Sequence, residues 1–163
     1  MMMRMTIPKL ALGAVALSLM SATPAAARSE RCAVASQAAV ESQFERFNAS
    51  WATRDPDQVT ALFGPGAVLL PTLSNTPRTD PAQIRDYFVG FLKKSPVGKI
   101  DTSNVRVGCN LATRVGIWTV SLTDPATGQR SDVKARYSFV YRYAAGRWLI
   151  DHLHSSVMPE GQH

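Results

Sequence analysis

The chain has 163 residues, and 18 lysines and arginines against 12 aspartates and glutamates give it a formal charge of +6. This length fits a single domain, and 45% apolar with 18% charged residues is atypical of a disordered chain. Two cysteines are too few for a small scaffold built from disulfides. The positive charge is scattered, with no basic run longer than Lys93-Lys94, so nucleic acid is not an expected partner.

Residues 1–27 have the pattern of a signal peptide. They combine a basic start at Arg4, a short apolar stretch over 10–20 and small residues over 25–27, where a signal peptidase cuts. An N-terminal membrane anchor is the alternative, for which the apolar run is short. We therefore expect one mature domain, residues 28–163, that is periplasmic or secreted and has no membrane association after cleavage.

Export would place both cysteines, Cys32 and Cys109, in an oxidising compartment. We expect a disulfide between them. Two separate buried thiols are the alternative.

The first half of the predicted domain has helical signals. A stripe of large apolar residues indicates a long helix over 33–54: Val40, Phe44, Phe47 and Trp51. Two further helices are predicted to begin at Asp55-Pro56 and Asp80-Pro81, because aspartate suits the N-cap and proline the first helical position. Between these helices we expect a short strand over 67–70 and a loop over 71–79.

The second half changes to strands, expected over 98–109, 114–123, 132–143 and 147–157. The short turns between them make neighbouring strands antiparallel. Helices followed by strands indicate an α+β fold, in which a curved antiparallel sheet wraps around the long N-terminal helix and leaves a cone with an open end. Small ligands commonly bind at such mouths.

This element order resembles the SnoaL-like, or nuclear-transport-factor-2-like, superfamily. Residues 146–159, Gly-Arg-Trp-Leu-Ile-Asp-His-Leu-His-Ser-Ser-Val-Met-Pro, are more specific. They are similar to the closing strand of the association domain of calcium/calmodulin-dependent protein kinase II and its bacterial SgcJ/EcaC-type relatives. The resemblance covers roughly 33–159 and implies an oligomerising module without kinase activity, since the sequence has no glycine-rich phosphate loop and no His-Arg-Asp catalytic loop.

The resemblance also implies a ligand pocket. In the kinase association domain the concave sheet face lines a pocket with arginines, and the outer face makes subunit contacts. Ser155, Ser121 and Ser138 stand where that family carries pocket arginines. Arg136 would be the remaining pocket cation, able to grip a carboxylate or phosphate with its planar fork. An exposed or ion-paired arginine is the alternative.

The loop over 71–79 is a candidate lid at the cone mouth, where Asn75 and Arg78 would contact a ligand. A rigid connector held by its two prolines is the alternative. His152 and His154 face one way on a strand and could hold a metal, but no third ligand is evident. No metal or other cofactor is therefore expected.

An acid/base pair is the basis of a second functional class. SnoaL-like cyclases and ketosteroid isomerases use a carboxylate base in an apolar cone with a donor opposite. Asp151, expected on the same face as Ser155, and Tyr87, expected on the helix that roofs the pocket, are the candidates. Core packing is the alternative for Tyr87.

The sequence therefore predicts an exported, self-associating module that binds a small organic molecule, which could be anionic. The alternative is a SnoaL-like isomerase, cyclase or dehydratase that uses an inner carboxylate. One face of the strand over 132–143 carries four aromatic residues: Tyr137, Phe139, Tyr141 and Tyr143. We expect a second copy to cover this face in a homo-oligomer, most simply a dimer.

Overall fold

The computed structural model describes residues 32–159, and the predicted signal peptide lies outside them. The elements in chain order are α1 (Gln37–Ala52), α2 (Pro56–Thr60), β1 (Phe63–Leu70), α3 (Pro81–Phe91), a short 3-10 turn (Leu92–Lys94), β2 (Val97–Val107), β3 (Leu111–Thr123), β4 (Arg130–Ala144) and β5 (Arg147–Val157). The α+β fold class is confirmed. No helix in this part of the chain combines the length and the hydropathy that crossing a membrane requires.

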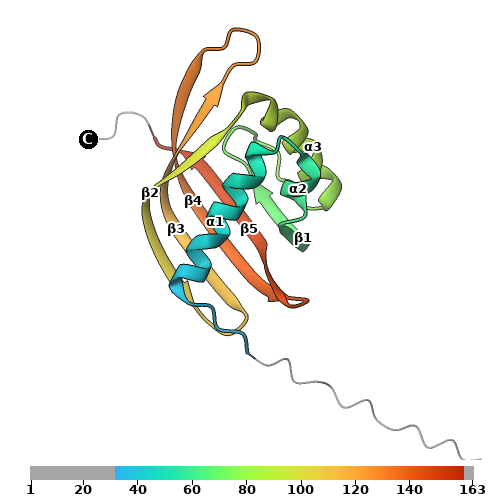
Figure 1. The fold of residues 1–163 in the computed structure, drawn as a ribbon, viewed down its shortest axis with the longest axis vertical. Helices are drawn as coiled ribbons and strands as arrows, with labels where there is room; N and C mark the ends of the chain where they lie inside the picture. Colours follow the sequence, from blue (N-terminus) through green and yellow to red (C-terminus); the bar gives the residue numbers. More distant parts are fainter. Residues whose placement is uncertain (1–31, 160–163) are drawn as a thin grey trace, which may run out of the picture. The chain divides into compact units, whose positions relative to one another are not determined.

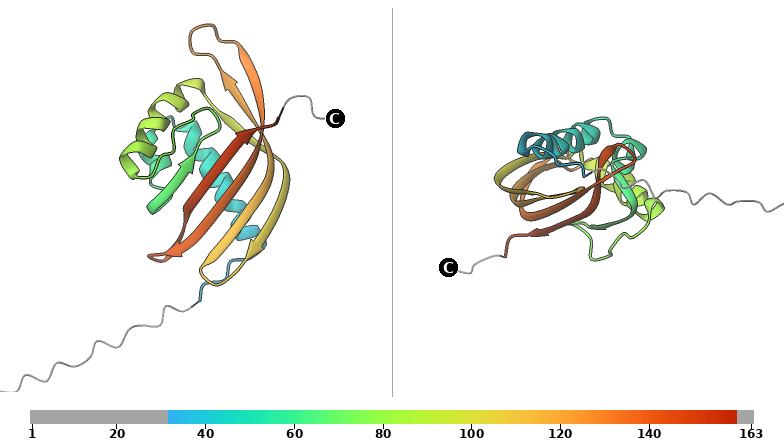
Figure 2. Two further views of the ribbon diagram at one scale, coloured as in Figure 1. Left: turned by 180° about the vertical axis from the view of Figure 1, so that it is seen from behind. Right: turned by 90° about the horizontal axis from the view of Figure 1, so that it is seen from below.

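The five strands form one curled sheet in the order β1-β5-β4-β3-β2. All neighbouring strands are antiparallel except β1 and β5, which are parallel. Figures 1 and 2 show α1 lying across the concave face of this sheet, while α2 and α3 lie beside its edge strand β1, toward one end. The β3–β4 hairpin extends past the helices at the same end (Figure 1).

Side-chain caps fix where the helices begin. Ser36 Oγ accepts a hydrogen bond from the Ala39 amide at the start of α1 (3.1 Å). Asp55 and Asp80 cap α2 and α3, and a proline follows each of them, as the sequence predicts. Strand β1 begins earlier than expected, because Gly64-Pro65-Gly66 belongs to the strand.

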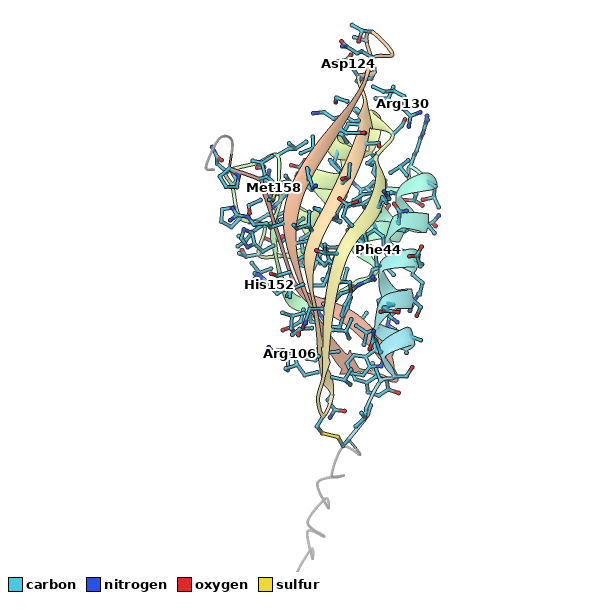
Figure 3. The ribbon with its side chains drawn as sticks, turned by 90° about the vertical axis from the view of Figure 1, so that its left-hand side faces the viewer. Phe44, Arg106, Asp124, Arg130, His152 and Met158 are labelled. Carbon is cyan, nitrogen blue, oxygen red and sulfur yellow. A yellow bond between two sulfur atoms is a disulfide. The ribbon has the colours of Figure 1, made fainter. Side chains whose placement is uncertain are left out.

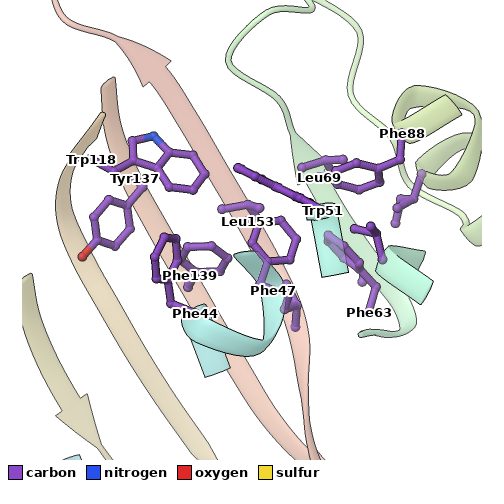
Figure 4. Packing of buried hydrophobic residues seen from close by; sticks show 14 of the residues in the cluster. Phe44, Phe47, Trp51, Phe63, Leu69, Phe88, Trp118, Tyr137, Phe139 and Leu153 are labelled. Atoms are coloured by element: carbon purple, nitrogen blue, oxygen red, sulfur yellow. The ribbon is translucent and has the colours of Figure 1, made fainter. Parts of the chain in front are cut away.

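The stripe of apolar residues on α1 packs against the concave face of the sheet. Phe47 is fully buried, and its ring centroid lies 5.5 Å from that of Phe139 on β4. Tyr137 lies beside Phe139 in the same cluster (Figure 4), and Tyr141, whose ring stacks on that of Phe139, is buried there as well. The expectation that a second copy covers this aromatic face is wrong, because α1 of the same chain covers it.

A disulfide between Cys32 and Cys109 ties the segment before α1 to the β2–β3 turn. Their Cα atoms are 5.0 Å apart. Asn110, in the left-handed backbone region with φ 55°, exchanges two further hydrogen bonds with Ala33 (2.7 and 2.9 Å). The first residues of the described chain are thus held by one covalent and two hydrogen-bonded links.

Gly116 lies where β2 bulges toward β3. A Cβ atom at this position would stand 2.0 Å from the carbonyl oxygen of Thr102. That oxygen also accepts a hydrogen bond from the Tyr137 hydroxyl (3.0 Å), so β2 cannot move away without losing this contact. We predict that Gly116→Ala lowers the free energy of unfolding by about 1–3 kcal/mol, the usual range for overpacking, in urea denaturation.

Gly90 provides the matched control. It lies in α3, and a Cβ atom there would meet nothing within 4 Å. Gly90→Ala is therefore expected to be neutral or to stabilise the protein by up to about 1 kcal/mol, as alanine is the better helix former. Equal losses in both variants would contradict the close approach at Gly116.

Candidate ligand-binding cavity

An apolar cavity opens at the end of the sheet where α3 and the loop after β1 lie. The space within it that water-sized molecules can occupy is about 30 Å³. The rings and aliphatic side chains that line it come from α1, α3, the loop after β1 and the inner face of the sheet: Phe47, Trp51, Leu69, Pro71, Leu73, Tyr87, Phe88, Phe91, Trp118, Val120, Leu122, Val133 and Leu153. Such a lining favours a ligand with an apolar body.

A small polar cluster lies in one wall of the cavity. Trp118 Nε1 donates a hydrogen bond to Ser155 Oγ (3.0 Å), and the Thr72 hydroxyl donates to the same oxygen. Ser155 is only 6% exposed. Ser155 therefore lies in the cavity wall, on the face where the sequence predicts it. Its hydroxyl, hydrogen-bonded to a neutral indole, stands at the position where the resemblance implies an arginine in the family.

Two further polar groups belong to residues of the cavity lining. Trp51 Nε1 is buried and has no hydrogen-bond partner among residues 32–159. The Cζ3 edge of this indole faces Gly98, so the nitrogen lies on the opposite edge. Burial raises the pKa of the Tyr87 phenol, which keeps the hydroxyl protonated at neutral pH.

The prediction that Arg136 and Ser138 face the cavity is wrong. Along β4 the buried positions are Ala135, Tyr137, Phe139 and Tyr141, and Arg136 and Ser138 alternate with them. A strand points successive side chains to opposite faces, so both lie on the outer face of the sheet. The alternative of an exposed strand arginine is the one observed for Arg136, which is solvent-exposed.

Ser121 also lies on the outer face, again contrary to its predicted place in the pocket. On β3 the buried residues Trp118, Val120 and Leu122 point inward, and Ser121 alternates with them. Its hydroxyl donates a hydrogen bond to Asp132 on β4 (2.6 Å). This pair stabilises the projecting hairpin and does not touch the cavity.

Asp151 does not face the cavity either, because β5 bulges at this residue. In the β4–β5 register Val140 pairs with His152, and the next residue, Tyr141, pairs with Ile150, so Asp151 is skipped. Its carboxylate instead accepts two hydrogen bonds from the Arg142 guanidinium (2.8 and 2.9 Å). This contact lowers the pKa of Asp151. The proposed acid/base pair of Asp151 with Tyr87 is therefore not assembled.

The two histidines lie on the outer face of the sheet, because they alternate with the inward residues Leu153 and Ser155. His152 and His154 pair with the outward positions Val140 and Ser138 of β4. Figure 3 shows His152 on the side of the sheet away from α1. Across the described residues, no three histidine, cysteine, aspartate or glutamate side chains form a group that could hold a metal ion.

The loop over 71–79 contributes Pro71, Thr72 and Leu73 to the cavity lining, and it is anchored at both ends. Arg78 and Leu69 exchange two backbone hydrogen bonds of 2.9 Å, and Thr72 reaches Ser155 across the cavity wall. Leu73, 43% exposed, lies at the mouth. Asn75 lines a shallow groove on the outer side of the loop, and Arg78 lines an open groove on the α3 side.

The sequence reasoning missed the wall that β3 contributes. The alternation of apolar and polar residues that turns Trp118, Val120 and Leu122 inward can be seen in the sequence. None of the three residues was predicted to line the pocket. It also missed Arg114, a 6% exposed cation on the inner face. Arg114 donates to Ser103 Oγ (2.9 Å) and to the Glu41 carbonyl (3.1 Å), so it serves packing outside the cavity lining.

Comparison with known proteins places this geometry in a family. The model of the calcium/calmodulin dependent protein kinase II association domain matches residues 36–159. A solved structure from Xanthomonas campestris, described as such an association domain, is 46% identical, with a TM-score of 0.72 over 75% of this chain and 87% of its own. None of the curated proteins matches the chain.

More distant structures share the fold. A nuclear transport factor 2 (NTF2-like) superfamily protein from Salmonella enterica is 21% identical, with a TM-score of 0.65 over 75% of this chain and 91% of its own. A protein from Streptomyces avermitilis, described as a dehydratase of the NTF2-like family, is 11% identical, with a TM-score of 0.67 over 75% and 96%. At these identities the likeness concerns the fold alone.

Proposed function

Because the chain belongs to the calcium/calmodulin-dependent protein kinase II association-domain family, we propose that it is an exported, self-associating module that binds a small organic molecule. Membership of an association-domain family implies self-association. The family match concerns the association domain, and the kinase motifs are absent from the sequence. The proposed role is therefore binding and assembly without kinase activity.

The apolar cavity is the observation that carries the binding role. Its walls are mostly aromatic and aliphatic, with a few polar groups placed at fixed points. Pockets that bind small molecules commonly combine these two features. The ligand body that suits this lining is apolar, and the Ser155–Thr72 pair in the wall offers it a hydrogen bond.

The catalytic alternative lacks support at this cavity. None of the side chains that line it in the described chain carries a carboxyl or imidazole group. The one carboxylate expected there, Asp151, is paired with Arg142 on the outer face. The isomerase, cyclase and dehydratase chemistry considered from the sequence needs an inner carboxylate, so binding is the better-supported role.

The outer face of the sheet is our proposed surface for a dimer. Its centre carries aliphatic side chains that no element of the described chain covers, among them Val115, which is 39% exposed, with Ile117 and Val140 beside it. Two such faces can pair about a two-fold axis. Light scattering of the mature protein should give at least twice the mass of one chain, and the mass of a single chain would contradict self-association.

Export to the periplasm is likewise part of the proposal. Residues 1–27 supply the signal-peptide pattern, and the Cys32–Cys109 disulfide suits an oxidising compartment. Mass analysis of the protein from its own host should give a chain that begins near Arg28.

Native mass spectrometry tests the binding role. Protein purified from its own host should carry a small molecule that is released on unfolding. Val133→Phe, which adds a ring to the cavity wall, should lose this molecule, whereas Val107→Phe, at an exposed position of β2 outside the lining, should keep it. Equal retention by both variants would place the ligand outside the cavity, and a ligand-free wild type that binds no apolar probe would contradict the proposal.

A further inference from the structure

Two histidines are presented together on the outer face of β5. His152 and His154 alternate with the buried residues Leu153 and Ser155, and Figure 3 shows His152 on the side of the sheet away from α1. Residues two apart on a strand point the same way, with Cα atoms roughly 6.6–6.8 Å apart. His152 is half-buried and His154 is exposed, so both imidazoles can be reached from outside the chain.

A single chain supplies only half of a metal site at this place. The neighbouring carboxylate, Asp151, already accepts two hydrogen bonds from the Arg142 guanidinium (2.8 and 2.9 Å). Among residues 32–159, no third histidine, cysteine, aspartate or glutamate joins the two histidines in a group that could hold a metal ion. A closed zinc site takes four ligands, and one chain offers two nitrogens. The expectation of no metal, drawn from the sequence, rests on this count for one chain.

The two histidines lie within the outer face that we propose for the dimer. Strand β5 is next to the central strand β4. His152 is paired with Val140 of β4, which belongs to the aliphatic centre of that face, and with Val68 of β1. A two-fold axis brings the same patch of both copies together. Each pair of histidines can therefore meet its own symmetry mate across the interface.

We propose that His152 and His154 of two copies together bind one zinc ion at the two-fold axis of the dimer. Two imidazoles from each copy complete the tetrahedral set of four, and imidazole nitrogen is a common zinc ligand. The inference rests on the proposed self-association and adds its regulation. Because the site is complete only in the dimer, zinc binds the dimer more tightly than the single chain and stabilises it.

Sedimentation equilibrium of the mature protein measures this coupling. In EDTA the wild type should still form the dimer, and one equivalent of Zn²⁺ per two chains should lower the dissociation constant of the dimer by about tenfold or more, within the usual range for coupled binding. Calorimetry should find one zinc ion bound per two chains. Co²⁺ in place of zinc should give the intense visible absorption of a tetrahedral site, in contrast to the weak absorption of the hydrated ion.

Histidine variants locate the site. His152→Ala and His154→Ala each leave one imidazole per copy, and in both variants Zn²⁺ should no longer tighten the dimer. His163→Ala changes the one other histidine of the sequence and should respond to Zn²⁺ as the wild type does. His154 is exposed, so its replacement should leave the fold and the dimer in EDTA unchanged, which circular dichroism and sedimentation verify.

The outcomes separate the zinc site from self-association. A dimer with the same dissociation constant in EDTA and in Zn²⁺ would overturn the zinc site and leave self-association intact. One zinc ion bound per chain without a change in mass would contradict a shared site, as would a response that is lost in His163→Ala and kept in His154→Ala. The mass of a single chain at every concentration, with and without Zn²⁺, would overturn both proposals.

Discussion

Replacing Cys32 and Cys109 together by serine is expected to lower the free energy of unfolding by about 4 kcal/mol. The disulfide closes a loop of 77 residues, and the chain-entropy treatment of a loop of this length assigns it about that stabilisation. The effect is large because the bridge spans most of the fold, from the segment before α1 to the turn between β2 and β3. Urea denaturation of both proteins measures it.

Reductant provides the matching control for this prediction. Wild-type protein in reductant should approach the stability of the double serine variant, while the variant itself should not respond. Mass analysis of unreduced, denatured wild-type protein should find no thiol that can be alkylated. Two free thiols, or equal stability of the two proteins, would contradict the bridge.

Phe47→Ala is expected to destabilise the protein by about 3–5 kcal/mol, as for other fully buried phenylalanines. The ring is fully buried at the centre of the core, with ring centroids 4.8 to 6.2 Å from those of four other aromatic residues: Trp51, Phe63, Phe88 and Phe139. It joins α1 to the sheet and to α3 at once (Figure 4). Thermal and urea unfolding give the measurement.

Two substitutions calibrate the Phe47 result. Phe47→Leu keeps an apolar group of intermediate size and should lose clearly less stability than Phe47→Ala. Val89→Ala, at a 38% exposed position of α3, should stay within about 0.5 kcal/mol of the wild type. A loss at Phe47→Ala as small as that of Val89→Ala would contradict the central place of this ring.

Much of the fold was predictable because its signals are local. The aspartate–proline pairs at Asp55 and Asp80 mark helix starts through capping, and the structure places both caps as predicted. Strand β5 occupies the predicted residues 147–157, since the turn at Gly146 sets its start. The predicted membership of the association-domain family is confirmed as well.

The assignment of sheet faces was the part that local pattern could not decide. Strand β4 alternates aromatic with polar and cationic residues, so either face could be taken as the concave one. Which face of β4 is the inner one depends on α1. The rings of Phe44 and Phe47 on this helix pack on Phe139, so the aromatic face is the inner one. Arg136 consequently points outward, and the predicted pocket cation is missing from the cavity.

The β-bulge at Asp151 is a second feature of the structure that the sequence pattern could not predict. Counting by two from Ser155 places Asp151 on the inner face, and this count is valid only in an uninterrupted ladder. The bulge breaks the ladder at that residue, and Asp151 meets Arg142 on the outer face instead. Nothing in the pattern around residues 149–153 marks the extra residue, so the catalytic hypothesis could not be tested before the structure.

The three tryptophans of the chain allow the most direct test of the ligand cavity. Trp51 and Trp118 line it, while Trp148 lies toward the β4–β5 turn beside Tyr143. In NMR spectra of the indole N–H groups, titration with a small apolar probe such as hydrocinnamyl alcohol should shift the resonances of Trp51 and Trp118 and leave that of Trp148 in place. A shift confined to Trp148, or unchanged resonances for all three, would contradict a binding cavity inside this sheet.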